Sequence, residues 1–211
     1  MINAEIKRRG KEVKKVLNRL LPDADVALKF HNPFQLLVAT ILSAQCTDTL
    51  VNKVTPSLFR KYKTSAAFAK ADVSKLAKDI YPVTFYKNKA KAIKATAKII
   101  TGQYGGKVPK EKDKLIKLPG VASKTANVVL AHAYKIASGF IVDTHVKRVS
   151  KRLGLTKNTD PKKIEADLMQ VFDKKDWIKT ADQLIWFGRR YCTAKKDKCA
   201  ELGIKLKHYS K

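Results

Sequence analysis

The feature that most constrains the fold is residues 34–42, a stretch that is apolar on nearly every side. A helix with apolar residues all round has to be covered by other elements, so the stretch predicts a central core helix. Asn32 followed by Pro33 is typical of a helix start, a cap and then the first turn. We therefore expect the rest of the chain to pack around this helix.

The other apolar residues recur with the helical period of 3.6. Val13, Val16, Leu17 and Leu20 predict one buried face of a first helix over residues 4–21. No window alternates with period two for more than a few residues, and no repeat of 20–50 residues is present. The sequence predicts an all-α fold of about ten helices, whose remaining segments are 48–59 (with a kink or break at Pro56), 66–71, 73–80, 89–100, 110–118, 123–137, 144–153, 161–171 and a last helix carrying Trp177 and Phe187.

The charge of the chain points to a polyanionic partner. Lysine and arginine number 45 against 18 acidic residues, which gives a formal net charge of +27. Such a field attracts nucleic acid most commonly; a solvated lysine-rich surface or an anionic membrane surface is the alternative. The chain has no apolar run long enough for a transmembrane helix and no apolar core of a signal peptide. Three cysteines are too few for a disulfide scaffold, so we expect a protein of the reducing cytoplasm or its nucleoid.

A Pro119-Gly120 turn separates two helical segments between residues 110 and 137. Backbone amides of a tight turn and of a helix N-terminus can hold one phosphate without reading the base sequence. By itself the turn could equally be an ordinary helix–helix connection. The charge of +27 shifts the interpretation toward DNA.

Two residues stand out as reactive candidates. Lys124 is expected in the first turn of the helix after the hairpin, where its charge opposes the helix dipole. Asp143 follows an apolar run and precedes a helix, so it is expected to be an N-cap, a role compatible with catalysis. A lysine amine with a fixed carboxylate supports nucleophilic chemistry, although a surface lysine and a simple cap are the alternatives.

These residues carry a family resemblance. Residues 118–129, with Lys124 and then Asp143 nineteen residues on, resemble endonuclease III, a helix-hairpin-helix DNA glycosylase. Residues 43–48 and 86–90 match the same pattern, as does Gly188-Arg189 before Cys192. The resemblance implies an all-α fold in two parts: a six-helix domain over residues 26–136, and a second domain built from residues 1–25 and 137–211. It also implies duplex DNA as the partner of a monomeric protein.

The resemblance further implies a mechanism. A damaged nucleotide is flipped out of the duplex, Lys124 attacks its sugar with help from Asp143, and β-elimination through a Schiff base cuts the strand. Oxidised pyrimidines are the expected substrates, with Gln45 filling the gap in the duplex. Phe85 stands where the family has a wedging leucine, but it could also be a core residue. The remaining DNA contacts implied are Gly120, Val121, Ala122, Ser123 and His145. The alternatives are a glycosylase for a mismatched or deaminated base, and a non-catalytic DNA-binding protein.

The sequence departs from the family at its metal centre. Endonuclease III proteins normally hold a four-iron cluster on four cysteines spaced C-x6-C-x2-C-x5-C. Here Cys192 and Cys199 keep the first spacing, but Leu202 and His208 occupy the last two positions. We therefore expect no cluster and no other cofactor; zinc on Cys192, Cys199 and His208, or a Cys192–Cys199 disulfide, are the alternatives. Two further positions differ from the family pattern: Ala122 stands where the family has the second glycine of the hairpin, and Thr84 stands where it has a glycine before the wedge residue.

Overall fold

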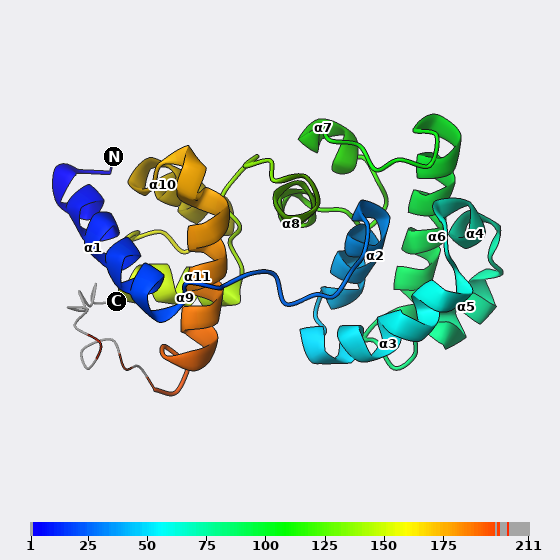
Figure 1. Ribbon diagram of the computed structural model, residues 1–211, viewed down its shortest axis with the longest axis horizontal. Helices are drawn as coiled ribbons and strands as arrows, with labels where there is room; N and C mark the ends of the chain where they lie inside the picture. The colour runs from blue at the N-terminus through cyan, green and yellow to red at the C-terminus, as the bar shows by residue number, and fades with distance from the viewer. Residues whose placement is uncertain (1, 197, 199–201, 203–211) are drawn as a thin grey trace. The chain divides into compact units, whose positions relative to one another are not determined.

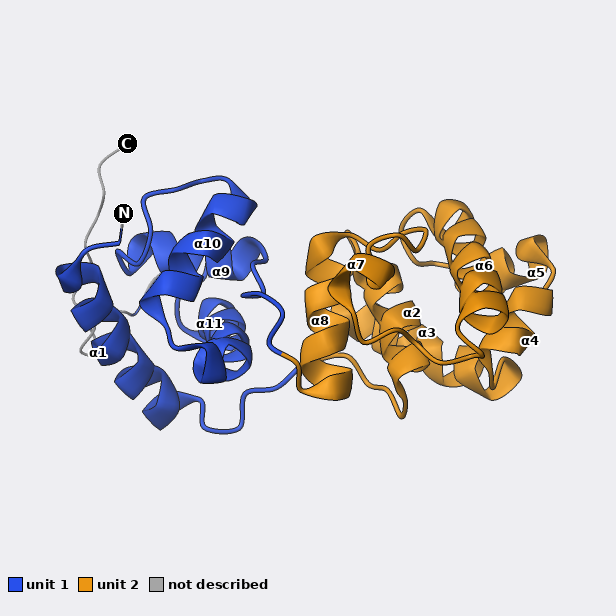
Figure 2. Ribbon diagram, turned by 90° about the horizontal axis from the view of Figure 1, so that it is seen from above, with its two compact units in different colours: residues 1–26, 137–211 blue, residues 27–136 orange. Residues whose placement is uncertain are grey.

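The computed structural model describes residues 2–196, 198 and 202, which form eleven α-helices and one short 3₁₀ helix. None of the described residues forms a strand, so the all-α prediction is confirmed. The chain divides into two compact units, one of residues Ala27–Ile136 and one of Met1–Val26 with Ala137–Lys211 (Figures 1 and 2). No helix in the described part of the chain is long and apolar enough to cross a membrane.

The unit of residues Ala27–Ile136 is organised around α2 (Pro33–Ser43). Leu36, Leu37 and Val38 of this helix have no exposed surface, as the apolar stretch predicts. The Asn32 side chain accepts a hydrogen bond from the Gln35 amide at 2.9 Å and caps the helix. The helices that complete this unit are α3 (Asp48–Lys61), α4 (Ser65–Lys70), α5 (Val73–Asp79), α6 (Tyr86–Gln103), α7 (Lys112–Leu115) and α8 (Ser123–Tyr134).

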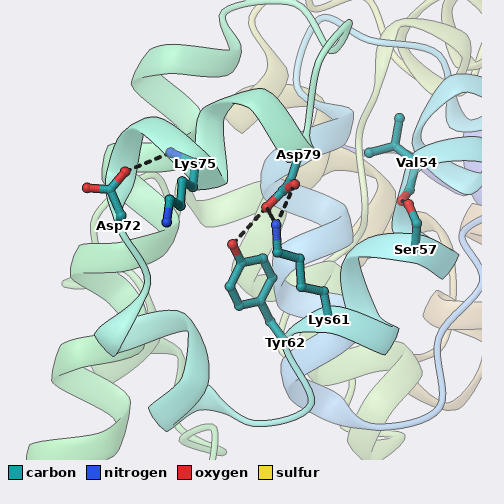
Figure 3. Close-up of polar contacts among 7 residues, drawn as sticks. All are labelled: Val54, Ser57, Lys61, Tyr62, Asp72, Lys75 and Asp79. Carbon is teal, nitrogen blue, oxygen red and sulfur yellow. Dashed lines mark hydrogen bonds and ion pairs between the residues drawn. The ribbon is translucent and has the colours of Figure 1, made fainter.

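A polar cluster joins the end of α3 to α5 (Figure 3). Lys61 Nζ donates to both carboxylate oxygens of Asp79, at 2.8 and 2.7 Å, and the Tyr62 hydroxyl donates to the same carboxylate at 2.7 Å. Burial raises the pKa of the Tyr62 phenol, and the Asp79 carboxylate adds to the effect. The cluster holds the C-terminal ends of α3 and α5 together.

The other unit contains α1 (Ala4–Leu20), α9 (Thr144–Arg152), α10 (Pro161–Val171), the 3₁₀ helix η1 (Lys174–Asp176) and α11 (Trp177–Arg190). Helix α11 packs against α9 and α1. Leu17, Val149 and Leu184, from these three helices, are fully buried. The Asp143 side chain caps α9, as the sequence predicts, and the Asp160 side chain caps α10.

Several helix boundaries differ from the sequence prediction. Helix α3 runs through Pro56, so a break there is wrong. Helix α6 begins at Tyr86 rather than at residue 89. The sequence prediction missed the first turn because its residues are polar or half-buried and show no apolar face. The helix expected over residues 110–118 is only Lys112–Leu115, since the turn into Pro119 takes up the rest.

Candidate DNA-binding and catalytic site

The hairpin between α7 and α8 is a tight turn that requires glycine at position 120. Gly120 has a φ of +78°, in the left-handed region. A Cβ there would lie 3.1 Å from Ala92 Cβ, so the backbone rests directly on α6. The Val121 amide donates to the Leu118 carbonyl at 3.1 Å, and the Thr96 hydroxyl donates to the Pro119 carbonyl at 2.8 Å. The turn is thus fixed both internally and from α6.

Helix α8 begins at the hairpin without a side-chain cap. Its N-cap Ala122 has φ −87° and ψ 170°, an ordinary extended conformation, so alanine in place of the family's glycine leaves this turn unstrained. Because no side chain caps the helix, its first-turn amides are available to an external acceptor such as a phosphate. Val121 is 6% exposed, so any DNA contact it makes comes from its backbone, whereas Ser123 is half-buried.

Lys124 is the second residue of α8 and is exposed. The residue therefore lies at the positive end of a helix dipole, in the same turn as the amides that could hold a phosphate. This is the position that the sequence predicts.

Gln45 and Phe85 are exposed loop residues of the same unit. Gln45 follows α2 and has a φ of +52°; Phe85 precedes α6 and has a φ of +56°. Phe85 is 58% exposed, so its interpretation as a core residue is wrong. A large exposed aromatic side chain in the left-handed region is costly, so its surroundings must hold it there.

Asp143 and His145 lie in the other unit, at the start of α9. Asp143 Oδ1 accepts a hydrogen bond from the Val146 amide at 2.8 Å, and the carboxyl is half-buried. The Nδ1 atom of the His145 ring lies 3.2 Å from Arg148 Nη2. Burial lowers the pKa of His145, while the Asp143 charge opposes that shift. The two reactive candidates thus belong to different units, Lys124 to one and Asp143 to the other.

Comparison with known proteins identifies the family to which the chain belongs. Residues 38–174 match the model of the HhH-GPD superfamily of base excision DNA repair proteins. Endonuclease III of Synechocystis sp. is 49% identical over 198 residues, which cover 94% of this chain and 90% of that protein. The chain belongs to the endonuclease III family.

Further comparisons agree with this assignment. Endonuclease III of Escherichia coli is 36% identical over 178 residues, 84% of each chain. A solved structure of a trapped endonuclease III–DNA covalent intermediate has a TM-score of 0.90 and 40% identity, and covers 97% of this chain and 94% of that one. A thermostable thymine-DNA glycosylase has a TM-score of 0.85 at 25% identity, over 98% and 99% of the two chains. As an endonuclease III protein, the chain is a DNA-binding base excision repair enzyme, a DNA glycosylase with AP lyase activity.

The residues present do not fit the iron–sulfur cluster of the endonuclease III family. The chain has three cysteines, whereas the cluster uses four. Leu202, at the third cluster position, offers no side-chain ligand; its carbonyl accepts from Arg19 Nη2 at 3.4 Å. Cys199 and His208 lie outside the described residues, so the zinc and disulfide alternatives concern a part of the chain whose structure is not described.

Arginine side chains of α9 hold residues 188–194, the segment that includes Cys192. Arg148 Nε and Nη2 donate to the carbonyl of Cys192 at 3.2 and 3.0 Å, and Nη2 also donates to the Gly188 carbonyl at 2.9 Å. Arg152 donates to the carbonyls of Thr193 at 2.6 Å and Ala194 at 3.2 Å, and to Cys192 Sγ at 3.3 Å. Two guanidinium groups therefore fix residues 188–194 against α9.

Lys89 lies within residues 86–90, which match the family pattern, but it is not among the site residues that the sequence predicts. Lys89 is 7% exposed, and its ammonium donates to two carbonyls at the end of α2. A signal was present in the sequence, because Lys89 lies four residues before Ile93 and shares the buried stripe of α6. Arg148 is another residue that the sequence does not single out, and it is half-buried.

Proposed function

We propose that this chain removes oxidised pyrimidines from duplex DNA and cuts the strand at the resulting site, with Lys124 as the nucleophile. The observation that carries the proposal is an exposed lysine in the first turn of α8, directly after an uncapped hairpin turn. A phosphate held by the first-turn amides would place the neighbouring sugar within reach of the amine. The net charge of +27 supplies the attraction to the duplex.

The proposed reaction begins when the lesion nucleotide is flipped out of the base stack. The neutral amine of Lys124 attacks the anomeric carbon, and the bond from that carbon to the base breaks. The base leaves with the bonding electrons and takes up a proton. The nitrogen then loses a proton, the bond from the anomeric carbon to the ring oxygen breaks, and the ring oxygen takes up the proton, which gives a protonated Schiff base. Removal of a proton from the adjacent sugar carbon then expels the 3′ phosphate, which is β-elimination.

In this proposal Asp143 accepts a proton from the lysine or offsets positive charge on the sugar. Its place at the N-cap of α9 keeps the carboxylate fixed by the Val146 amide. Gln45 fills the space that the flipped base leaves, and Phe85 wedges the opposite strand; their exposure at loop positions supports both roles. The amides around Gly120, Val121, Ala122 and Ser123 hold the phosphate backbone, with His145 as a further contact.

Borohydride trapping tests the nucleophile, since it reduces the Schiff base to a stable amine. The parent protein should form a covalent adduct with a duplex that carries an oxidised pyrimidine, and Lys124→Ala should form none. Lys117→Ala, which removes an exposed lysine from the other side of the turn, is the matched control. If Lys124→Ala forms the adduct at the parent's rate, Lys124 is not the nucleophile. A panel of lesion duplexes that includes mismatched thymine tests the substrate, and faster reaction of any base other than an oxidised pyrimidine would disprove it.

We further propose that the protein works without a metal centre, as a monomer on nucleoid DNA. Three cysteines and Leu202 at a ligand position support the first point. Purified protein should be colourless, should contain no stoichiometric iron or zinc, and should sediment as a monomer. Brown protein with four irons per chain would overturn the proposal.

A further inference from the structure

Lys89 is a buried charge at the end of the central helix. It belongs to α6, is 7% exposed, and its Nζ donates to the carbonyls of Leu42 at 2.7 Å and Ala44 at 2.6 Å. These carbonyls lie at the C-terminal end of α2, where the last carbonyls of a helix have no partner within it. The ammonium therefore caps α2 from the neighbouring helix, and α2 and α6 pack against each other (Figure 1).

The capped end of α2 presents Gln45. The residue follows Ala44 directly, is exposed, and has a φ of +52°. A side chain other than glycine stays in this region only when its surroundings hold it there. The Cys46 amide closes the turn on the Ser43 carbonyl at 3.1 Å, and Lys89 holds the carbonyl just before Gln45.

The same lysine is connected to Phe85. Its backbone amide donates to the Phe85 carbonyl at 3.0 Å, which is the first helical hydrogen bond of α6. Phe85 is 58% exposed and also has a positive φ, of +56°. The backbone amide of Lys89 thus holds the loop that carries Phe85, and its side chain holds the loop that carries Gln45.

The burial of the Lys89 ammonium costs free energy, which its two hydrogen bonds to α2 offset. Charged residues are rarely buried, and burial lowers the pKa of the Lys89 ammonium, with Cys46 opposing the shift. An apolar side chain on the buried stripe of α6 would pack without that cost, but it would leave the two α2 carbonyls unpaired.

We propose that Lys89 is a positioning residue that fixes Gln45 and Phe85 relative to each other, so that both enter the duplex as one unit when a nucleotide is flipped. The inference rests on the proposed function of those two residues. It predicts that Lys89 affects the flipping step and acts through Gln45, without touching DNA.

The first test compares Lys89→Met with Lys98→Met, which removes the same charge from an exposed position on α6. The probe is a duplex with thymine glycol next to 2-aminopurine, whose fluorescence rises when the stack opens. Because small displacements in a site can cost up to about a hundredfold in rate, we expect Lys89→Met to slow unstacking and excision by about ten- to a hundredfold. Affinity for undamaged duplex should match that of Lys98→Met, since each variant loses one charge.

A double-mutant cycle with Gln45→Ala decides whether Lys89 acts through Gln45. We expect the double variant Lys89→Met/Gln45→Ala to unstack no more slowly than the slower single variant. A purely structural role of Lys89 would instead give multiplicative losses, and these would overturn the inference. Unstacking by Lys89→Met as fast as by Lys98→Met would overturn it too.

Two further arms keep the test decisive. If Lys89→Met does not fold, as judged by circular dichroism, Lys89→Gln replaces it, because its amide can still donate to one carbonyl. The Gln variant should then give an intermediate rate, and a rate equal to the parent's would count against the inference. Unstacking needs no covalent step, so a parent that unstacks the duplex but forms no borohydride adduct contradicts the proposed function and leaves this inference to be judged on its own readout.

Discussion

Arg152 gives the sharpest stability prediction, because its guanidinium binds three consecutive residues after α11, from Cys192 to Ala194. Replacing it by methionine keeps most of the side-chain volume and removes the donors to the carbonyls of Thr193 and Ala194. At about 1 kcal/mol net for each hydrogen bond, the free energy of unfolding should fall by about 2 kcal/mol. For a chain of this length that corresponds to a decrease in Tm of about 4–8 °C.

The two tryptophans make this measurement selective. Trp177 and Trp186 both belong to α11, in the same unit as Arg152, and they are the two tryptophans of the chain. Their fluorescence therefore reports the unfolding of this unit even if the two units unfold separately. Trypsin should also cut the variant faster after Lys195 and Lys196, which follow the segment that Arg152 holds and are exposed.

The matched control is Lys151→Met, which removes a positive charge from the same last turn of α9. A loss of favourable interaction with the helix dipole would affect both variants alike. If Arg152→Met melts at the same temperature as Lys151→Met and resists trypsin equally, the guanidinium contacts do not stabilise the loop, and the reasoning fails.

Gly120→Ala should cost about 1–2 kcal/mol from its positive φ and should weaken binding to abasic duplex, as measured by urea unfolding and fluorescence anisotropy. Ala122→Gly, at an ordinary φ, should cost less than about 1 kcal/mol, and equal losses of affinity in the two variants would contradict the turn geometry. His145 has a pKa below its usual 6.5 because of burial, so the unfolded chain takes up the proton first as the pH falls, and stability is lost below about pH 6.5. Urea unfolding followed by tryptophan fluorescence should show that His145→Gln loses less free energy of unfolding between pH 7 and pH 5 than the parent does. The same pH dependence of stability in variant and parent would exclude His145 as the source of the loss.

The parts of the fold that follow from local chemistry were predictable from the sequence. Asn32 and Asp143 each cap the helix expected of them, since a cap needs only a side chain that accepts a hydrogen bond from an amide three residues on. Thr47 and Asp160 cap α3 and α10 in the same way. The apolar stretch after Asn32 became the central helix for a similar reason, because its burial depends on its own composition.

The contacts made between distant segments were not predictable in the same way. Lys89 reads as a polar residue at the start of an amphipathic helix, and its acceptors lie 47 and 45 residues earlier in the chain. Arg148 reads as a solvated charge, yet it bonds a carbonyl 44 residues later. The exposure of Phe85 depends on the left-handed backbone at that residue, a conformation that phenylalanine itself does not favour.

The discontinuous unit imposes an order on folding during synthesis. Residues Ala27–Ile136 are continuous and can fold as soon as they have been made, whereas α1 needs α10 and α11 to cover Val13 and Leu17. About 140 residues separate the end of α1 from the start of α10, which takes roughly 7–28 s at about 5–20 residues per second. During that interval the basic, amphipathic α1 lacks α10 and α11, the two helices against which it packs in the folded unit.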